Sequence, residues 1–474
     1  MKICYLSAEV EPFAKSGGLG DVMGALPKAV AKLGHEVAVV MPYYKDVIAE
    51  KFQSQMQYLG YYYSDVAWRH QYVGVFTMKV NGVDVYFLDN EFYFKGPMYC
   101  FADNERFAYF AKASLDLLGW LNFQADVVHC NDWSTGLVPV LYDAFYKHND
   151  FYRDMKFVYT VHNLKYQGWA SKGELQDLTG LDDYYFTDDR LMHNGSANMM
   201  KGALVFSHAI TTVSPTYAQE ITTPEYGCGL EGVINTHIGK LHGVLNGVDY
   251  KAYNPYYDKL IAKKYGKKSA EEGKLANKLA LQEQLGLPIR EDVPMLALIS
   301  RLVDQKGLDL VLDQIHYILQ RDVQFVLLGT GDYEGPFHRI GEEYPTKVSA
   351  NLTFNNKLAH QIYAAADFVL VPSLFEPCGL TQIIGLKYGA VPIVRETGGL
   401  KDTVFSYNEK TKKGNGFSFT NYNAHDFGYT VHRALDFFAD KQVFAKIRKR
   451  GLACSYSWHR SSRRYLEIYE QVKK

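Results

Sequence analysis

Cysteine is scarce in this sequence, and long apolar runs are absent. The six cysteines are scattered and form no Cys-x-x-Cys pair, which excludes a disulfide framework and the usual zinc site. No apolar run approaches the roughly 18 residues that a membrane span needs, and the N-terminus lacks the charged-then-apolar layout of a signal segment. Cys4 lies within the first predicted strand, which favours a reducing compartment. We expect a soluble, cytoplasmic protein with no membrane partner.

An excess of charge of either sign is absent as well. The chain has 51 Lys and Arg against 52 Asp and Glu, a formal net charge of −1. This balance argues against a dedicated nucleic-acid surface, which needs clustered basic residues. Hydrophobic residues make up 47% and charged residues 22%, as in a globular enzyme. Because 474 residues exceed one ordinary core, we expect two domains.

Two series of short β-rich runs, separated by helix-like segments, divide the chain. The first comprises residues 2–9, 36–42, 83–89, 125–130, 156–163 and 208–214, and the second comprises residues 295–302, 323–331, 366–373 and 390–396. Such alternation is typical of parallel βαβ units with both faces of the sheet covered. The pattern predicts an α/β protein with two Rossmann-like, doubly wound domains facing each other across a cleft, over residues 1–246 and 247–456. Ligands of such sheets bind beyond the carboxyl ends of the strands.

The stretch "KSGGLGD", residues 15–21, follows the first predicted strand and precedes an apolar helix. Glycines let the backbone approach a ligand, and a helix start presents unpaired N–H groups and a positive dipole end. With the charge of Lys15, the stretch indicates an anion-binding loop; a tight turn with a solvated Lys15 is the alternative. It matches neither the P-loop nor the dinucleotide fingerprint, and the spacing of Gly329, Gly331 and Gly335 is also one residue too long for the latter.

The second half of the chain supplies basic and acidic residues at predicted strand exits. Arg301 and Lys306 lie in the loop that leaves one strand, and Glu376 lies at the exit of another. Arg offers a planar fork to phosphate oxygens, and Lys a movable point charge. Residues 378–381 open the next helix, a second anion-facing terminus. The alternatives are two exposed loop cations and a carboxylate that only caps a helix.

Seven motifs in chain order resemble the ADP-glucose-using glycogen and starch synthases. They are "KSGGLGD", "VHCNDW" from Val128, "TVHN" from Thr160, "VLNGVD" from Val244, "SRLVDQKG" from Ser300, "FEPCGLTQ" from Phe375 and "ETGGLKDTV" from Glu396. The resemblance covers essentially the whole chain. It implies a GT-B fold whose last helix, residues 457–474, packs back on the first domain. It also implies retaining transfer of glucose from a nucleotide sugar, ADP-glucose with UDP-glucose as the alternative, to the non-reducing end of an α-1,4-glucan.

The resemblance also implies roles for individual residues. The amides of Gly17 and Gly18, with Lys15, Arg301 and Lys306, would hold the diphosphate, and Glu376 would bind the glucose hydroxyls and stabilise the oxocarbenium-like centre. Further positions are implied for the substrates: His162 and Asn246 for the donor, Asp21 near the glucose or the acceptor, Asp132 on the acceptor side, Phe354 against the adenine, and the helix start Cys378, Gly379, Leu380 and Thr381 for sugar hydroxyls and phosphate. No metal or other cofactor is implied, and the sequence has no Asp-x-Asp pair.

Some positions depart from the family pattern or are predicted only broadly. Asn131 stands where many relatives have His and is assigned no role, and Ile384 stands where the wider pattern expects a second carboxylate. Aromatic residues make up 15% of the chain, and the tyrosine clusters at residues 61–65 and 90–101 could stack on glucan rings. Tyr93 and Tyr99 are the candidate acceptor contacts.

Three other functions are considered. A nicotinamide-dependent dehydrogenase would share the sheets, but the chain lacks its fingerprint. A glycogen phosphorylase would need a Schiff-base lysine and pyridoxal phosphate. A non-catalytic glycan-binding module would be expected to have lost the charged cleft residues, which are all present. The sequence does not predict an oligomeric state.

Overall fold

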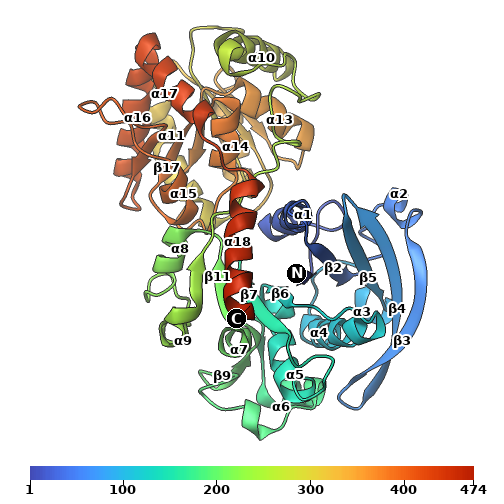
Figure 1. Cartoon of the computed structure of the whole chain (residues 1–474). Helices are drawn as coiled ribbons and strands as arrows, with labels where there is room; N and C mark the ends of the chain where they lie inside the picture. Colours follow the sequence, from blue (N-terminus) through green and yellow to red (C-terminus); the bar gives the residue numbers. More distant parts are fainter. The chain divides into compact units, whose positions relative to one another are not determined.

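The computed structural model describes residues 1–474 and divides them into two compact units (Figure 1). One unit contains Met1–Gly247 together with Trp458–Lys474, and the other contains Val248–Ser457. The junctions predicted from the sequence are at residues 246/247 and 456/457. The fold is α/β in both units, because short apolar strands alternate with helices that cover them.

The N-terminal unit is built on a nine-stranded sheet. Its strands, in spatial order, are β12 (Leu241–Gly243), β11 (Ala209–Thr212), β7 (Lys156–Val161), β6 (Val127–Asn131), β1 (Lys2–Leu6), β2 (Glu36–Pro42), β5 (Val83–Asp89), β4 (Arg69–Val80) and β3 (Gln57–Val66). All neighbours are parallel except β5, β4 and β3, which pair antiparallel. A small second sheet contains β8 (Trp169–Ala170), β10 (Ser196–Asn198) and β9 (Met192–His193).

The helices of the N-terminal unit come from both ends of the chain. They are α1 (Gly18–Ala31), α2 (Glu50–Gln53), α3 (Glu91–Phe94), α4 (Asp103–Trp120), α5 (Val138–Phe145), α6 (Lys172–Thr179), α7 (Met199–Phe206), α8 (Pro215–Glu220), α9 (Glu231–Thr236) and α18 (Trp458–Lys473). The last of these, α18, packs against α1 and β7. Its Tyr469 hydroxyl is hydrogen-bonded to His129 Nδ1 of β6 at 2.6 Å, so the C-terminal helix is tied to the centre of this sheet.

The C-terminal unit is built on a six-stranded, all-parallel sheet. Its strands, in spatial order, are β15 (Val348–Asn351), β14 (Gln324–Leu328), β13 (Met295–Ile299), β16 (Phe368–Val371), β17 (Val391–Arg395) and β18 (Phe417–Phe419). Its helices are α10 (Ala270–Gln284), α11 (Leu308–Ile318), α12 (Glu334–Glu343), α13 (Asn356–Ala365), α14 (Thr381–Tyr388), α15 (Gly398–Thr403), α16 (Ala424–Ala439) and α17 (Lys441–Ala453).

Alternate residues of these strands fill two separate cores. On β14, Phe325 and Leu327 lie in one apolar cluster, and Val326 and Leu328 lie in the other. Because side chains alternate across a strand, a sheet covered on both faces needs apolar residues at successive positions. This burial explains the continuous apolar runs that predicted the strands.

All ten predicted strands are confirmed, as β1, β2, β5, β6, β7, β11, β13, β14, β16 and β17. The β3–β4 hairpin was not predicted, because its outer residues are tyrosines and polar side chains rather than an apolar run. None of the helices has the combination of length and apolarity needed to cross a bilayer.

Candidate active site

The glycine-rich loop between β1 and α1 is organised by a buried carboxylate. Glu9, only 4% exposed, accepts hydrogen bonds from Ser16 N at 2.6 Å, Ser16 Oγ at 2.7 Å and Gly17 N at 3.2 Å. It also accepts a hydrogen bond of 2.6 Å from the Tyr99 hydroxyl. Sequence reasoning missed Glu9; the available signal was a carboxylate three residues beyond a strand end, just before the loop. The Glu9 side chain therefore fixes the conformation of the loop through its hydrogen bonds to Ser16 and Gly17.

The three glycines of this loop serve different purposes. A Cβ at Gly20 would lie 2.9 Å from the Cβ of Lys15, so glycine is needed there for packing. At Gly17 and Gly18 a Cβ would meet no atom within 4 Å, and neither residue has a positive φ. Nothing within the chain demands glycine at these two positions, which is the pattern expected where a ligand approaches the backbone.

The amides and charges of the loop are partly used within the chain. The Gly17 amide was predicted to bind the diphosphate, but it donates to Glu9. The Gly18 amide, at the first residue of α1, has no acceptor within the chain. The Lys15 ammonium pairs with Asp21 Oδ1 at 2.6 Å. Burial raises the pKa of Asp21, and the neighbouring Lys15 opposes this rise. The loop thus offers the Gly18 amide, which has no acceptor within the chain, and Lys15, which is ion-paired with Asp21. The two side chains of this pair are equally exposed.

His162 lies at the carboxyl end of β7, and its ring is held by Asn131 at the end of β6. The Asn131 amide donates to the backbone oxygens of Leu6 and His129, so its Oδ1 faces His162 Nε2 at 3.0 Å. This orientation makes Nε2 the protonated nitrogen of the imidazole. Burial lowers the pKa of His162 to about 3, so the ring is neutral at physiological pH. Asn131, to which the sequence assigned no role, sets the tautomer of the predicted donor-positioning histidine.

Asp132 is linked to His162 by a hydrogen bond from the His162 backbone amide. Its Oδ1 accepts from His162 N at 2.7 Å, and its own backbone has a φ of +56°, a left-handed conformation that is uncommon outside glycine. Burial raises the pKa of Asp132 to about 7; the backbone hydrogen bonds lower it, and the nearby Glu9 charge raises it further. The structure therefore gathers the glycine loop, Asp132 and His162 at the carboxyl ends of the adjacent strands β1, β6 and β7.

Asn246 of the same unit is buried, and its Oδ1 has no hydrogen-bond partner. A buried amide oxygen without a donor carries an energetic cost, and a missing ligand is one physical reason for such a group. The prediction that Asn246 contacts the donor agrees with this observation and stays a prediction.

Tyr93 and Tyr99 have structural roles in this fold. Tyr93 is 3% exposed, its ring stacks on Tyr109 with centroids 4.4 Å apart, and its hydroxyl donates to Glu105. This packing leaves almost none of its surface for a sugar, so the structure gives no support to the acceptor contact at Tyr93, which stays a prediction. Tyr99 is half-buried and donates to Glu9, and it therefore supports the glycine loop.

In the C-terminal unit, Glu376 and Lys306 form an ion pair. Lys306 Nζ lies 2.7 Å from Glu376 Oε2, which also accepts from Ser373 Oγ at 2.9 Å. Both side chains of the pair are mostly buried, at 17% and 10% exposure. Lys306 follows β13 and Glu376 follows β16, so the pair lies at the carboxyl edge of neighbouring strands, as predicted for a ligand site. Arg301, in the same loop as Lys306, is exposed.

The backbone of Glu376 is held by the glycine pair at the start of α15. Gly399 N donates to Glu376 O at 3.1 Å. A Cβ at Gly398, whose φ is +44°, would lie 2.0 Å from that same oxygen. Only glycine permits this contact, because any side chain would displace the carboxylate-bearing segment. The "TGG" part of "ETGGLKDTV" therefore positions Glu376.

The start of α14 and the loop after β15 complete this edge. The N-cap residue Leu380 offers no side-chain cap, so the first amides of α14 are open to an external acceptor. Gly379 has a φ of +73°, Cys378 is buried, and Thr381 is the first helical residue. Phe354 lies between β15 and α13 and is 87% exposed. An exposed phenylalanine at the sheet edge is available for stacking on a flat ring.

Family models match both halves of the chain. Residues 2–236 match the starch synthase catalytic domain, and residues 282–446 match glycosyl transferases group 1. With two units built on parallel sheets and charged groups at their carboxyl edges, these matches define a GT-B glycosyltransferase.

Individual relatives extend over the whole chain. It is 49% identical to the glycogen synthase of Geobacillus stearothermophilus, covering 100% of this chain and 98% of the relative. It is 46% identical to the glycogen synthase of Clostridium perfringens, covering 100% and 99%. The chain therefore belongs to the glycogen and starch synthase family of glucosyltransferases, and the resemblance inferred from its motifs is confirmed.

Solved structures agree with this assignment. The catalytic domain of starch synthase IV from Arabidopsis thaliana, bound to ADP and acarbose, superposes with a TM-score of 0.92 at 35% identity and covers 100% of this chain and 99% of that one. A sucrose-phosphate synthase from Thermosynechococcus elongatus, at 17% identity and a TM-score of 0.63 over 99% and 98% of the two chains, shares the fold.

Proposed function

We propose that this glucosyltransferase uses ADP-glucose and extends the non-reducing end of an α-1,4-glucan with retention of configuration. The observation that carries the proposal is the Lys306–Glu376–Ser373 cluster at the carboxyl edge of the C-terminal sheet. A carboxylate and a cation 2.7 Å apart match the charges that appear when a glucose–phosphate bond breaks, positive on the sugar and negative on the phosphate. The ADP in the starch synthase IV structure supports the choice of donor.

In this proposal Glu376 faces the sugar. Its carboxylate accepts hydrogen bonds from glucose hydroxyls and stabilises the oxocarbenium-like centre. Ser373 and Lys306 hold its Oε2, so the carboxylate keeps one orientation while the sugar changes charge. Preorganised groups of this kind need no reorganisation at the moment of reaction.

Lys306 and Arg301 are assigned to the diphosphate. As the glycosidic oxygen leaves, negative charge accumulates on the β-phosphate. One preorganised donor contributes about 3–4 kcal/mol to such charge stabilisation, by analogy with oxyanion-hole donors. The open amides at the start of α14 and the exposed Phe354 are assigned to phosphate and adenine.

The residues of the N-terminal unit are assigned to the glucose and to further phosphate contacts. Lys15 and the Gly18 amide would contact the diphosphate. His162, neutral and protonated on Nε2 toward Asn131, leaves Nδ1 as an acceptor for a glucose hydroxyl. The acceptor 4-hydroxyl attacks the face from which the phosphate departs, and the phosphate oxygen takes its proton. The proposal includes no metal ion.

Steady-state rates with ADP-glucose and UDP-glucose, using glycogen as acceptor, test the proposal. We expect a higher kcat/KM for ADP-glucose, and an α-configured new linkage in the proton NMR spectrum. Glu376→Gln should lose most of kcat, whereas Glu283→Gln, an exposed glutamate of α10, should behave as wild type. A folded Glu376→Gln variant with wild-type kcat would refute the assignment of the sugar-facing carboxylate.

A further inference from the structure

The side chain of Gln382, in the first turn of α14, is completely buried, and the proposed function does not use it. Its exposure is 0%, and its Nε2 donates to Gly379 O at 2.8 Å, Cys378 O at 3.1 Å and Thr403 Oγ1 at 3.2 Å. The amide cannot be turned over, because its oxygen would then face the two carbonyl oxygens. Gln382 therefore serves as a donor toward the backbone that follows Glu376.

The oxygen of the same amide shows that the donors are what this position needs. Gln382 Oε1 is buried and has no hydrogen-bond partner. A buried amide oxygen without a donor costs free energy. A methionine of similar length would avoid this cost, but it could not donate to the two carbonyls.

Together with Gly399, Gln382 holds four successive carbonyl groups. Gly399 N donates to Glu376 O at 3.1 Å and to Pro377 O at 3.3 Å, and Gln382 donates to the next two carbonyls. Thr403 links the two donors, because its hydroxyl donates to Gly399 O at 2.6 Å and accepts from Gln382. The segment that begins with the catalytic candidate is therefore fixed along its length by α14 and α15.

Fixing these carbonyls also sets the direction of the amides that follow them. In a trans peptide the C=O and N–H groups point in opposite directions. The Cys378 and Gly379 carbonyls point toward Gln382, so the Gly379 and Leu380 N–H groups point away from it. Neither of these N–H groups has an acceptor within the chain.

The torsions of this turn bring the two amides to one side. Gly379 has a φ of +73°, and Leu380 has right-handed helical torsions. Successive N–H groups in such a turn form a concave anion site. A Cβ at Gly379 would lie 2.5 Å from Gln382 Oε1, so any other residue would also displace the amide that holds the turn. Gln382 and Gly379 are matched to each other.

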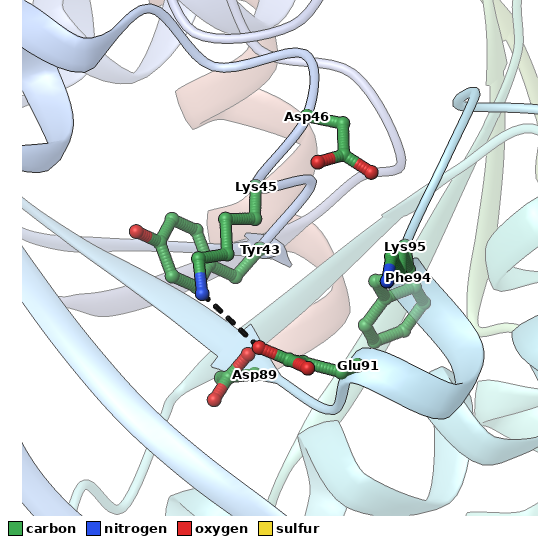
Figure 2. Close-up of a pocket in the computed structure, with 7 residues that line it drawn as sticks. All are labelled: Tyr43, Lys45, Asp46, Asp89, Glu91, Phe94 and Lys95. Carbon is green, nitrogen blue, oxygen red and sulfur yellow. Dashed lines mark hydrogen bonds and ion pairs between the residues drawn. The ribbon is translucent and has the colours of Figure 1, made fainter.

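A pocket of the N-terminal unit has the opposite electrostatic character (Figure 2). Three carboxylates line it, those of Asp46, Asp89 and Glu91, against the two ammonium groups of Lys45 and Lys95. Lys45 is ion-paired with Glu91 at 3.0 Å. The excess of carboxylates repels a phosphate, whereas the turn before α14 offers amide donors without an acceptor.

We propose that Gln382 is a positioning residue for glucosyl transfer. It holds the Cys378 and Gly379 carbonyls, so that the Gly379 and Leu380 amides face the diphosphate of the donor. Gln382 itself touches no substrate and acts through the backbone. The assignment of these amides to the diphosphate rests on the proposed function.

Gln382→Met tests the proposal, because it keeps the length of the side chain and removes its donors. The matched control is Gln282→Met in α10 of the same unit. Gln282 is also 0% exposed, and its Nε2 donates to Arg290 O at 2.9 Å and to Gln324 Oε1 at 2.7 Å. Both variants should therefore lose stability in chemical denaturation, and only Gln382→Met should change the binding of the donor.

Calorimetry with ADP and with adenosine separates positioning from a general loss of structure. Gln382→Met should bind ADP about tenfold more weakly or worse, because the amides that meet the charged phosphates are displaced. Its affinity for adenosine should stay unchanged, since adenosine has no phosphate. Gln282→Met should keep wild-type affinity for both and wild-type kcat/KM for ADP-glucose. An ADP affinity of Gln382→Met equal to that of Gln282→Met would overturn the proposal.

Thr403→Val keeps the test open if Gln382→Met does not fold. It removes the hydroxyl that links Gln382 to Gly399, and it should weaken ADP binding by about threefold without changing adenosine binding. Wild-type ADP affinity in this variant would count against the proposal.

A crystal structure of Gln382→Met, or of Thr403→Val in its place, separates this inference from the proposed function. Rotated peptides at residues 378–380 would support the positioning role, and an unchanged backbone there would overturn it. Absence of glucosyl transfer in the wild type would refute the proposed function, and the crystallographic result would still decide the role of Gln382.

Discussion

Replacing Lys306 by methionine removes the charge of the Lys306–Glu376 pair and keeps most of the apolar stem. The change leaves a carboxylate that is 10% exposed without its cation. Ser373 Oγ, at 2.9 Å, still donates to it. The variant therefore tests both the stability of the cluster and its proposed role in catalysis.

The expected loss of stability follows from the burial of the pair. Removing one partner of a fully buried ion pair costs about 3–5 kcal/mol, because the other charge is left uncompensated. The pair is 17% and 10% exposed rather than fully buried, so solvent screens part of this loss. We expect Lys306→Met to lower the free energy of unfolding by about 2–3 kcal/mol.

A double-mutant cycle separates stability from catalysis. Chemical denaturation of Lys306→Met, Glu376→Gln and the double variant should give a coupling energy of at least about 1 kcal/mol, because the neutral glutamine no longer needs a cation. kcat with ADP-glucose should fall by about 10²–10³ in Lys306→Met and should not recover in the double variant. Lys446→Met, an exposed lysine of α17, is the control.

Two results would refute this reasoning. Additive effects on stability would mean that the ion pair does not hold the carboxylate. A near-wild-type kcat of Lys306→Met would mean that Lys306 does not act on the leaving phosphate.

Four further outcomes are expected. Gly398→Ala should destabilise the C-terminal unit by at least about 2 kcal/mol and lower kcat, because its Cβ would lie 2.0 Å from Glu376 O; a wild-type melting temperature would contradict this. Burial lowers the pKa of His129 to about 3. The neutral ring therefore stabilises the native state completely above about pH 6.5, and this stabilisation is lost as the pH falls toward 3. Denaturation at pH 7 and pH 5 should therefore show His129→Gln gaining about 2 kcal/mol relative to wild type at the lower pH, and a constant difference would count against a neutral His129. Enzyme dialysed against EDTA should retain its activity, and a loss that Mg²⁺ restores would disprove metal-free transfer. Phe354→Ala should raise KM for ADP-glucose, Phe354→Trp should not, and equal KM values in all three proteins would exclude stacking on the base.

The sequence by itself determined the layout of the fold and the chemistry of one edge of each sheet. Strands buried on both faces need continuous apolar runs, and those runs are visible in the residue order alone. Lys306 and Glu376 could be singled out as candidates because each follows such a strand, and the carboxyl ends of parallel strands meet at one edge. Their roles came from the resemblance of the motifs to the family. The structure then brings the two within 2.7 Å.

Only the tertiary structure decided which residues hold these groups in place. Glu9 meets Tyr99 from 90 positions away, and His129 meets Tyr469 from 340 positions away. The periodicity of a sequence indicates only contacts between residues that are close in the chain. The partners of Glu9 and His129 depend instead on the order of the strands and on the packing of the last helix against the first unit. The same holds for burial. Tyr93 and Tyr61 both lie in stretches rich in aromatic residues, but Tyr93 packs on Tyr109 and Tyr61 lies on an exposed face. Only the pairing of the strands and helices decides which side of each residue is covered.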